Sequence, residues 1–120
     1  MHELYIAESI IRTLRESLPA DVTPDRVREA HVECGQLDAV IPETLQFLFD
    51  AIKAQHRLDD ARLVIREIPV RCRCEACRAE FGLDLPVFIC PECGGQNVQT
   101  LAGRGIRLVK INATDTEGEE

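Results

Sequence analysis

The strongest chemical signal in the sequence is a set of four cysteines arranged as two pairs. Two residues separate Cys74 from Cys77, two separate Cys90 from Cys93, and twelve residues lie between the pairs. Two residues between thiols allow both sulfurs to reach one ion, and two such turns facing each other complete a tetrahedron of thiolates. The spacing therefore predicts a structural zinc site with no open coordination position for chemistry.

Other interpretations of the cysteines stay open from the residues alone. Two disulfides or four unrelated buried thiols are possible, although a reducing compartment disfavours the disulfides. An iron-bound, rubredoxin-like electron carrier would use the same four thiolates, but the aromatic shell that such sites usually pack against is missing. Cys72 could compete for the metal, although the single residue between Cys72 and Cys74 fits a zinc turn poorly. Cys34 has the inward phase of a predicted strand and is expected to be a small core residue.

The N-terminus offers a second, different set of metal ligands. The α-amine of Met1, the backbone nitrogen of His2 and the His2 imidazole can close fused five- and six-membered chelate rings. A planar array of nitrogens suits Ni²⁺ or Cu²⁺ and does not suit zinc. Taken alone, a histidine at this position is more often a solvated side chain than a ligand.

Regular apolar patterns predict the elements that must position these residues. Spacings of three and four predict helices, and alternation predicts strands. The helices are expected at residues 4–18 and from Pro42 to near His56, and the strands at 30–34, 61–70 and 106–111. This order predicts an α+β fold in which two helices pack on one face of a three-stranded sheet, with an inserted zinc-ribbon subdomain.

The predicted domains follow from this order. Residues 1–71 and 100–112 are expected to form the α+β domain, and residues 72–99 the inserted zinc ribbon. Residues 113–120 have nothing to bury and are expected to form a disordered acidic tail.

Composition limits the classes of function. The chain has 120 residues and a net charge of −7, which argues against nucleic-acid binding because that needs a basic face. The apolar runs are too short to cross a membrane and no secretory signal is recognisable, so a cytoplasmic protein is expected. No acid, base or nucleophile constellation accompanies the metal ligands, so an enzyme is not expected.

The motifs, taken together, resemble the HypA/HybF family of hydrogenase nickel-incorporation proteins. The opening MHELYIAESI is followed in order by ECGQLDAVIPETLQFLFD, VRCRCEACRAEF and CPECGG, so the resemblance covers residues 1 to about 112. It implies that His2 binds nickel, with the Met1 amine and neighbouring backbone contributing and Glu3 next to the site. It also implies zinc at a distant four-cysteine site, here Cys74, Cys77, Cys90 and Cys93.

The resemblance further implies a metallochaperone that passes Ni(II), with a nickel-handling GTPase, to the large subunit of a [NiFe] hydrogenase, and in some relatives to urease. The main alternative is a zinc-ribbon module that binds nucleic acid or a transcription protein, which would need a basic, aromatic face that this sequence lacks. His31 and His56 could serve as further nickel ligands only if the fold brings them to the N-terminus.

Overall fold

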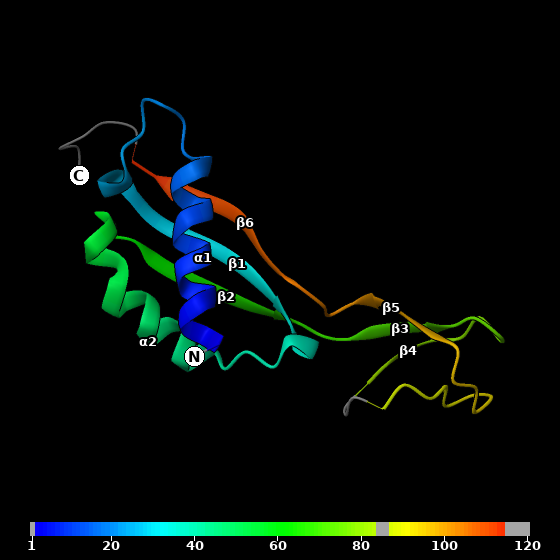
Figure 1. Ribbon diagram of the computed structural model, residues 1–120. Coiled ribbons are helices and arrows are strands. Elements are labelled where there is room, and N and C mark those ends of the chain that lie inside the picture. The colour runs from blue at the N-terminus through cyan, green and yellow to red at the C-terminus, as the bar shows by residue number, and fades with distance from the viewer. Residues whose placement is uncertain (1, 84–86, 115–120) are drawn as a thin grey trace. The chain divides into compact units, whose positions relative to one another are not determined.

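The computed structural model describes residues 2–83 and 87–114 of the chain. Its helices and strands are shown in Figure 1. The helices are α1 (His2–Ser17) and α2 (Pro42–Ile52), with 3₁₀ turns at Pro24–Arg26, Gln36–Asp38 and Lys53–His56. The strands are β1 (Val27–Gly35), β2 (Arg62–Ile68), β3 (Arg71–Cys74), β4 (Glu80–Gly82), β5 (Val98–Ala102) and β6 (Ile106–Ala113).

The described chain divides into two compact units. The first comprises residues 2–32, 40–66 and 107–114, and the second comprises residues 33–39 and 67–106. The second unit therefore takes in a short segment, 33–39, that is far away in the sequence. The assignment of nickel to the first unit and zinc to the second stays a prediction at this point.

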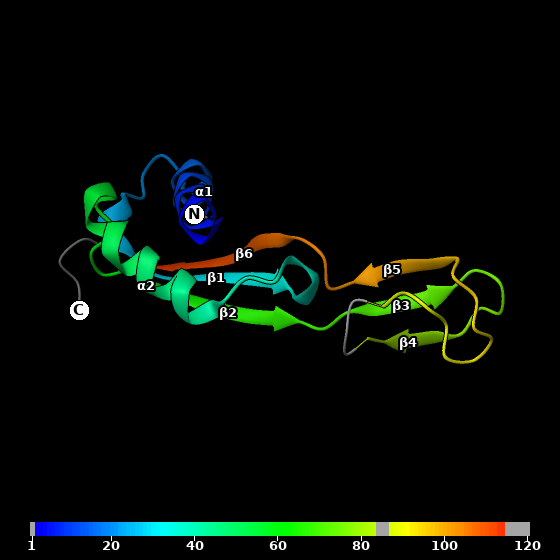
Figure 2. The same ribbon diagram turned by 60° about the horizontal axis from the view of Figure 1, so that its bottom comes forward.

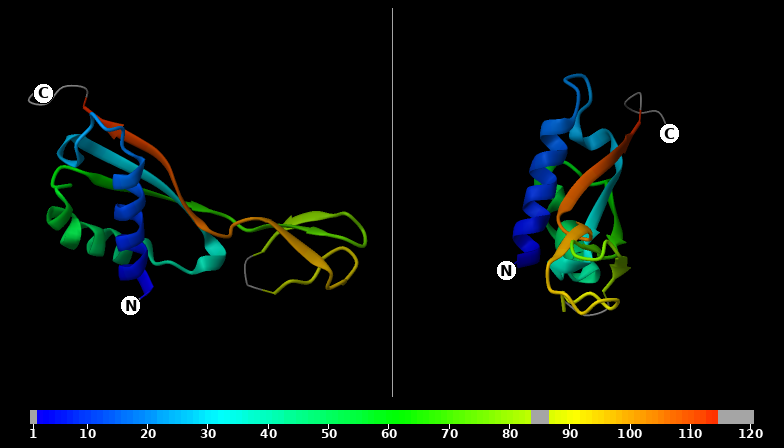
Figure 3. Two further views of the ribbon diagram at one scale, coloured as in Figure 1. Left: turned by 45° about the horizontal axis from the view of Figure 1, so that its top comes forward. Right: turned by 90° about the vertical axis from the view of Figure 1, so that its right-hand side faces the viewer.

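The first unit is built on a sheet with the strand order β2-β1-β6. Figure 2 shows β1 and β2 running in the same direction and β6 in the opposite one. Parallel neighbours need a crossover connection, and α2, which follows β1 and precedes β2, provides it. Helices α1 and α2 pack against each other on the sheet (Figure 3). The predicted α+β fold with two helices on a three-stranded sheet is confirmed.

The core of this unit is largely aliphatic, with Phe49 as an aromatic side chain buried in it. The residues buried along α1 recur with helical spacing, and α2 adds two more from adjacent turns. These residues are Ile6, Ala7, Ile10, Ile11 and Leu14 of α1 and Leu45 and Phe49 of α2. Ile41, which the apolar pattern assigns to the same stripe, is instead 54% exposed because it caps α2 outside the helix. No described helix has the length and apolar character needed to cross a membrane.

One predicted strand ends earlier in the structure than expected. The segment expected as a strand at 61–70 ends as β2 at Ile68, and β3 begins at Arg71 in the second unit. Pro69 lies between them and has no backbone N–H to donate to a sheet, which gives the physical reason for the break.

The second unit contains a sheet that the sequence patterns did not predict. Its strand order is β4-β3-β5, and both neighbours run antiparallel to β3. The segment 33–39 docks on this unit because Gly35 donates its N–H to Gly105 at 2.8 Å and Leu37 donates to Gly103 at 2.9 Å. A Cβ on Gly35 would collide with the Gly103 carbonyl, so only glycine allows this close approach of two backbones.

The strands were missed because they are short and interrupted by turns. β4 has three residues and β3 has four, which is too few for an alternating pattern to stand out from the surrounding cysteines and glycines.

The expected disordered tail begins later than residue 113. Ala113 is the last residue of β6, and Thr114 donates its N–H to the carbonyl of Arg26 at 2.9 Å. Residues 115–120 lie outside the described residues.

The first unit carries a polar cluster centred on Glu29 of β1. Its carboxylate accepts hydrogen bonds from Arg62 of β2 and Asn112 of β6, each at 2.8 Å, so it ties the central strand to both neighbours. The His31 imidazole lies 2.8 Å from the same carboxylate. The hydrogen bond from Arg62, followed by those from His31 and Asn112, lowers the pKa of Glu29 to about 2.

We predict that Glu29→Gln lowers the free energy of unfolding at neutral pH. The pKa of Glu29 falls from its ordinary 4.5 to about 2 in the folded chain, so the ionised carboxylate stabilises the fold above about pH 4.5. This contribution is lost as the pH falls toward 2. Urea denaturation followed by far-ultraviolet circular dichroism should therefore show a gap between wild type and variant that narrows as the pH is lowered from 7 to 3.

The exposed Glu8 of α1 supplies the control, since it lies outside this cluster. Glu8→Gln should leave the stability at neutral pH close to wild type. A Glu29→Gln gap that stays constant over the whole pH range would contradict a role for the ionised carboxylate.

Candidate metal centres

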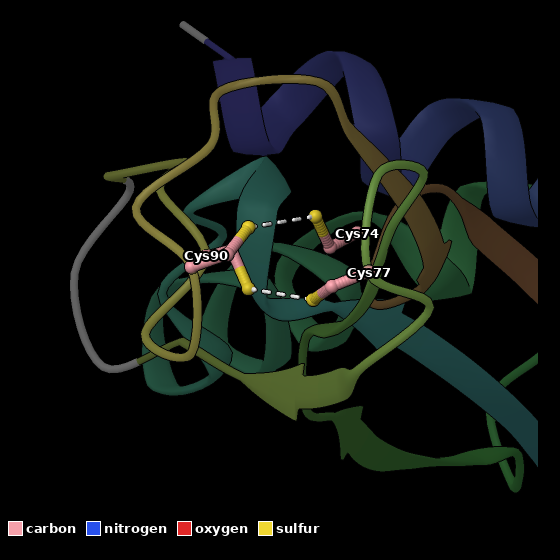
Figure 4. A group of neighbouring side chains, drawn as sticks. Cys74, Cys77 and Cys90 are labelled. Carbon is pink, nitrogen blue, oxygen red and sulfur yellow. Dashed lines mark hydrogen bonds between the residues drawn. The ribbon is translucent and has the colours of Figure 1, made fainter.

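The four cysteines of the two predicted pairs come together in the second unit. The sulfur atoms of Cys74, Cys77, Cys90 and Cys93 all lie within 4.8 Å of one another. The Cys74 and Cys93 sulfurs are 3.6 Å apart, as are those of Cys77 and Cys90. Figure 4 shows the thiols of Cys74 and Cys77 directed toward the turn that carries Cys90.

The size of this cluster fits a tetrahedral zinc site. Four thiolates at the usual Zn–S distance of about 2.3 Å from one ion have sulfurs separated by about 3.8 Å. The observed 3.6 Å is close to that value. All four thiols are free, which excludes the two-disulfide alternative for this structure. The donor set and its dimensions therefore fit zinc.

The two turns that hold the sulfurs have the same backbone design. The N–H of Arg78 donates to the carbonyl of Cys74, and the N–H of Gly94 donates to that of Cys90, both at 2.8 Å. In each turn the fourth residue after the first cysteine adopts a positive φ, 68° at Arg78 and 74° at Gly94. The chain thus reverses within five residues, which brings both sulfurs of a pair to the same side.

The backbone also stabilises negative charge on the sulfurs. Hydrogen bonds from the backbone N–H of Cys77, and also from that of Ala76, lower the pKa of Cys74 to about 7. The backbone N–H of Ala79 acts in the same sense on Cys77, but the three neighbouring thiols and burial together outweigh it and raise the pKa of Cys77 to about 12. Four thiols this close cannot all ionise without a cation between them. A bound divalent ion would remove this conflict.

The ribbon has a small core in which cysteine is the main component. Its buried members are Val70, Cys72, Cys74, Phe81 and Cys90. Cys72 is fully buried on β3 but does not belong to the group of four sulfurs. The sequence spacing alone leaves Cys72 as a possible competing ligand. In the structure, the alternation of β3 directs Cys72 and Cys74 to the same face, which explains why Cys72 lies close to the ligands without being one of the four.

This core contains aromatic side chains that the sequence argument against an iron site did not expect. Phe81 is buried in it, and the half-buried Phe88 packs against it. The lack of an aromatic shell therefore no longer separates zinc from iron.

The N-terminal residues lie at the start of α1 in the first unit. His2 is the first residue of the helix and is exposed, while Glu3 is buried, with 8% of its surface accessible. The Glu3 carboxylate accepts a hydrogen bond from the N–H of Ile41 at 3.2 Å, and Ile41 is the residue that precedes α2. No local sequence pattern indicates this bond, because the two residues are 38 positions apart. Met1 lies outside the described residues.

The other two histidines do not join His2. His31 is held by Glu29 in the polar cluster of the sheet. His56 lines a groove with Glu8, Arg12 and Glu16, further along α1. Since an α-helix rises about 1.5 Å per residue, that part of α1 lies roughly 10–20 Å from its start. Among the described residues, no group of three or more potential metal ligands includes His2 with either of these histidines.

Comparison with known proteins decides which family this arrangement represents. The sequence profile of a family described as "Hydrogenase/urease nickel incorporation, metallochaperone, hypA" matches residues 1–113. The chain belongs to the HypA family. The resemblance found in the sequence motifs is thus confirmed. The description of the family names nickel incorporation, and it names neither electron transfer nor nucleic-acid binding.

Relatives match this member of the HypA family along nearly its whole length. "Hydrogenase maturation factor HypA" of Streptomyces avermitilis is 34% identical, covering 96% of this chain and 88% of the relative. The protein of the same name from Azotobacter vinelandii is 37% identical, with 92% and 97% covered. The solution structure of the Ni metallochaperone HypA from Helicobacter pylori matches with a TM-score of 0.66 at 20% identity, covering 92% and 96%. At that identity the structural match supports the fold.

We predict that Cys74→Ala or Cys90→Ala removes zinc and loosens the second unit. The free energy of binding at a structural zinc site is also folding free energy, so loss of a ligand should unfold residues 72–99 while the first unit stays folded. Zinc per chain, measured by mass spectrometry of the purified metal-loaded protein, should fall well below one. Amide spectra should lose dispersion for the ribbon alone.

Cys72→Ala is the matched control. It removes a buried thiol of the same core without touching the group of four sulfurs. It should cost about 1–2 kcal/mol of stability through lost packing and keep one zinc per chain. Loss of zinc in Cys72→Ala with retention in Cys74→Ala would mean that the metal uses a different set of thiols.

Proposed function

We propose that the chain binds Ni(II) at its N-terminus and delivers it for maturation of a [NiFe] hydrogenase, while zinc at Cys74, Cys77, Cys90 and Cys93 maintains the ribbon. The observation that carries this proposal is the exposed His2 at the first position of α1. The family description supports a nickel cargo and the relatives' names support hydrogenase as the recipient. The same description includes urease, which is the second recipient that we consider.

The position of His2 favours chelation of nickel through backbone nitrogen. The first four N–H groups of a helix have no carbonyl partner within the helix, and those of His2 and Glu3 are the first two of α1. A metal can displace their protons without breaking a helical hydrogen bond. The N-terminal end of the helix dipole also stabilises the resulting negative charge. We propose the Met1 amine, the His2 backbone nitrogen and the His2 imidazole as nickel ligands.

Glu3 takes a different part in this proposal. Its carboxylate is buried and already accepts the Ile41 N–H, so it is engaged in holding the first turn of α1 against the start of α2. We therefore assign any nickel ligation by Glu3 to its backbone nitrogen. The carboxylate acts by fixing the helix turn on which the chelating nitrogens lie.

The two metals have opposite requirements. The four thiolates enclose zinc and leave no open position, which suits an ion that stays. Ligands from one exposed chain end can leave the metal one after another, which suits cargo that must be passed on. We propose a nickel-handling GTPase and the hydrogenase large subunit as partners in the cytoplasm, because the family resemblance implies them.

An N-terminal extension gives the sharpest test of the nickel site. Even a short extension turns the Met1 amine into an amide, so we expect it to weaken nickel binding at least tenfold without removing a side chain. His2→Ala should weaken binding comparably, while zinc content stays unchanged in both. The single tyrosine, Tyr5, lies one helical turn from His2, and the chain has no tryptophan, so nickel binding can be followed by quenching of tyrosine fluorescence.

His31→Ala and His56→Ala serve as controls for loss of an imidazole. Both should bind nickel as the wild type does, because neither side chain lies at the start of α1. Unchanged affinity in the extended protein would exclude the amine as a ligand. A large effect of His31→Ala or His56→Ala would instead require a site that combines distant imidazoles.

A pair of substitutions at Glu3 distinguishes positioning from ligation by the carboxylate. Glu3→Gln keeps an oxygen that can accept the Ile41 N–H, whereas Glu3→Ala removes the acceptor. If the side chain positions the first turn, calorimetric titration should give near wild-type nickel affinity for Glu3→Gln and several-fold weaker binding for Glu3→Ala. Equal losses in both variants would identify the carboxylate as a nickel ligand.

A further inference from the structure

The sheet of the first unit has an open edge beside α2. Its strand order is β2-β1-β6, so β2 pairs with β1 on one side, and among the described residues no strand pairs with its other side. An edge strand presents backbone N–H and C=O groups that can pair with a further strand. Charged residues stand at Arg62, Arg66 and Glu67 of β2, and the three residues between them, Leu63–Ile65, carry no charge.

A groove runs along this edge. It has a volume of about 440 Å³ and is lined by Ile65 of β2 together with one side of α2. The α2 lining is Pro42, Glu43, Gln46, Phe47 and Asp50. Because Ile65 and these helix residues share one groove, a strand added beside β2 would direct every second side chain into it.

Phe47 is the apolar feature of the groove. Leu45 and Phe49 of the same helix are fully buried, while Phe47 between them is 70% exposed. A single exposed apolar side chain is common and by itself indicates nothing. Here, however, the aromatic ring, the half-buried Ile65 and the open strand edge coincide.

The negative charge of the groove favours a basic ligand. Its two charged lining residues, Glu43 and Asp50, are both acidic and exposed. Lys53 approaches Asp50 to 3.4 Å and offsets part of its charge, whereas Glu43 has no cation in the lining. Acidic side chains next to an aromatic ring favour lysine or arginine, which can pair with the carboxylates and lie on the ring.

We propose that β2 and this groove bind an extended segment of a partner protein in which every second side chain, the set directed into the groove, includes both apolar and basic residues. The segment adds as a strand along Leu63–Ile65, and its apolar side chains contact Phe47 and Ile65. A lysine or arginine of the segment pairs with Glu43. A second copy of this chain is the less suitable occupant, because two chains of charge −7 repel each other.

The test uses the full-length, zinc-loaded protein and a defined probe. The probe is a blocked seven-residue peptide with valine, lysine and valine at its second, fourth and sixth positions and threonine elsewhere, so that valine and lysine share one face. Its comparison is the same peptide with glutamate in place of the lysine. In amide spectra the lysine peptide should shift the signals of Phe47 and of Leu63–Ile65. Those amides of Leu63–Ile65 that face the open edge should exchange with solvent at least about tenfold more slowly.

Substitutions in the groove then identify the contacts. Phe47→Ala should weaken binding of the lysine peptide at least about tenfold, as expected for an aromatic anchor. The matched control Tyr5→Ala removes a similarly exposed ring of α1, 66% accessible, and should have no effect. Glu43→Gln should weaken binding several-fold and reduce its salt dependence, whereas Glu8→Gln on α1 should not.

Three outcomes would overturn the proposal. The first is no shift at Leu63–Ile65, or shifts confined to β6 or to the acidic C-terminal residues. The second is equal affinity for the glutamate peptide. The third is slow exchange at Leu63–Ile65 that appears without peptide and increases with protein concentration, which would identify a second copy of the chain as the occupant.

Discussion

The arrangement of the second unit depends on the electrostatics of four thiols that lie within 4.8 Å of one another. Without a cation the backbone N–H groups of the turns favour ionisation of Cys74, but the close thiols oppose ionisation of Cys77. A zinc ion between them stabilises all four thiolates at once. Since cysteines supply most of the small ribbon core, the metal takes the place of the hydrophobic interior that so short a segment lacks.

At the proposed nickel site the same chain offers nitrogen ligands, and this difference in chemistry would separate the two ions. Four enclosing thiolates suit zinc, whereas an amine, a backbone nitrogen and an imidazole in one plane suit nickel. The start of α1 is well placed for the second task because its first N–H groups need no helical partner. The buried Glu3 carboxylate holds that turn by accepting the Ile41 N–H, so the exposed His2 belongs to an ordered first turn of the helix. We regard this contrast between an enclosed ion and an exposed one as the physical basis of the proposed function.

Local sequence patterns predicted the features that depend on neighbouring residues. Helical spacing located α1 and α2, alternation located β1 and β6, and the cysteine spacing located the four sulfurs. The contacts that the sequence did not predict all join distant segments. The bond from Ile41 to Glu3 and the approach of Gly35 to Gly103 have no signature in either segment alone. For the same reason, no pattern indicated that segment 33–39 belongs with the ribbon, where its Leu37 packs on the cysteine core.

X-ray absorption at the nickel and zinc edges of one sample tests the central claim most directly. The sample is the untagged, full-length protein with its zinc, loaded with one equivalent of Ni(II). The account predicts that nickel has only nitrogen and oxygen neighbours and that zinc keeps four sulfur neighbours at about 2.3 Å. Nickel–sulfur scattering, or loss of sulfur from the zinc shell when nickel is added, would contradict it, because the two ions would then compete for the same thiolates.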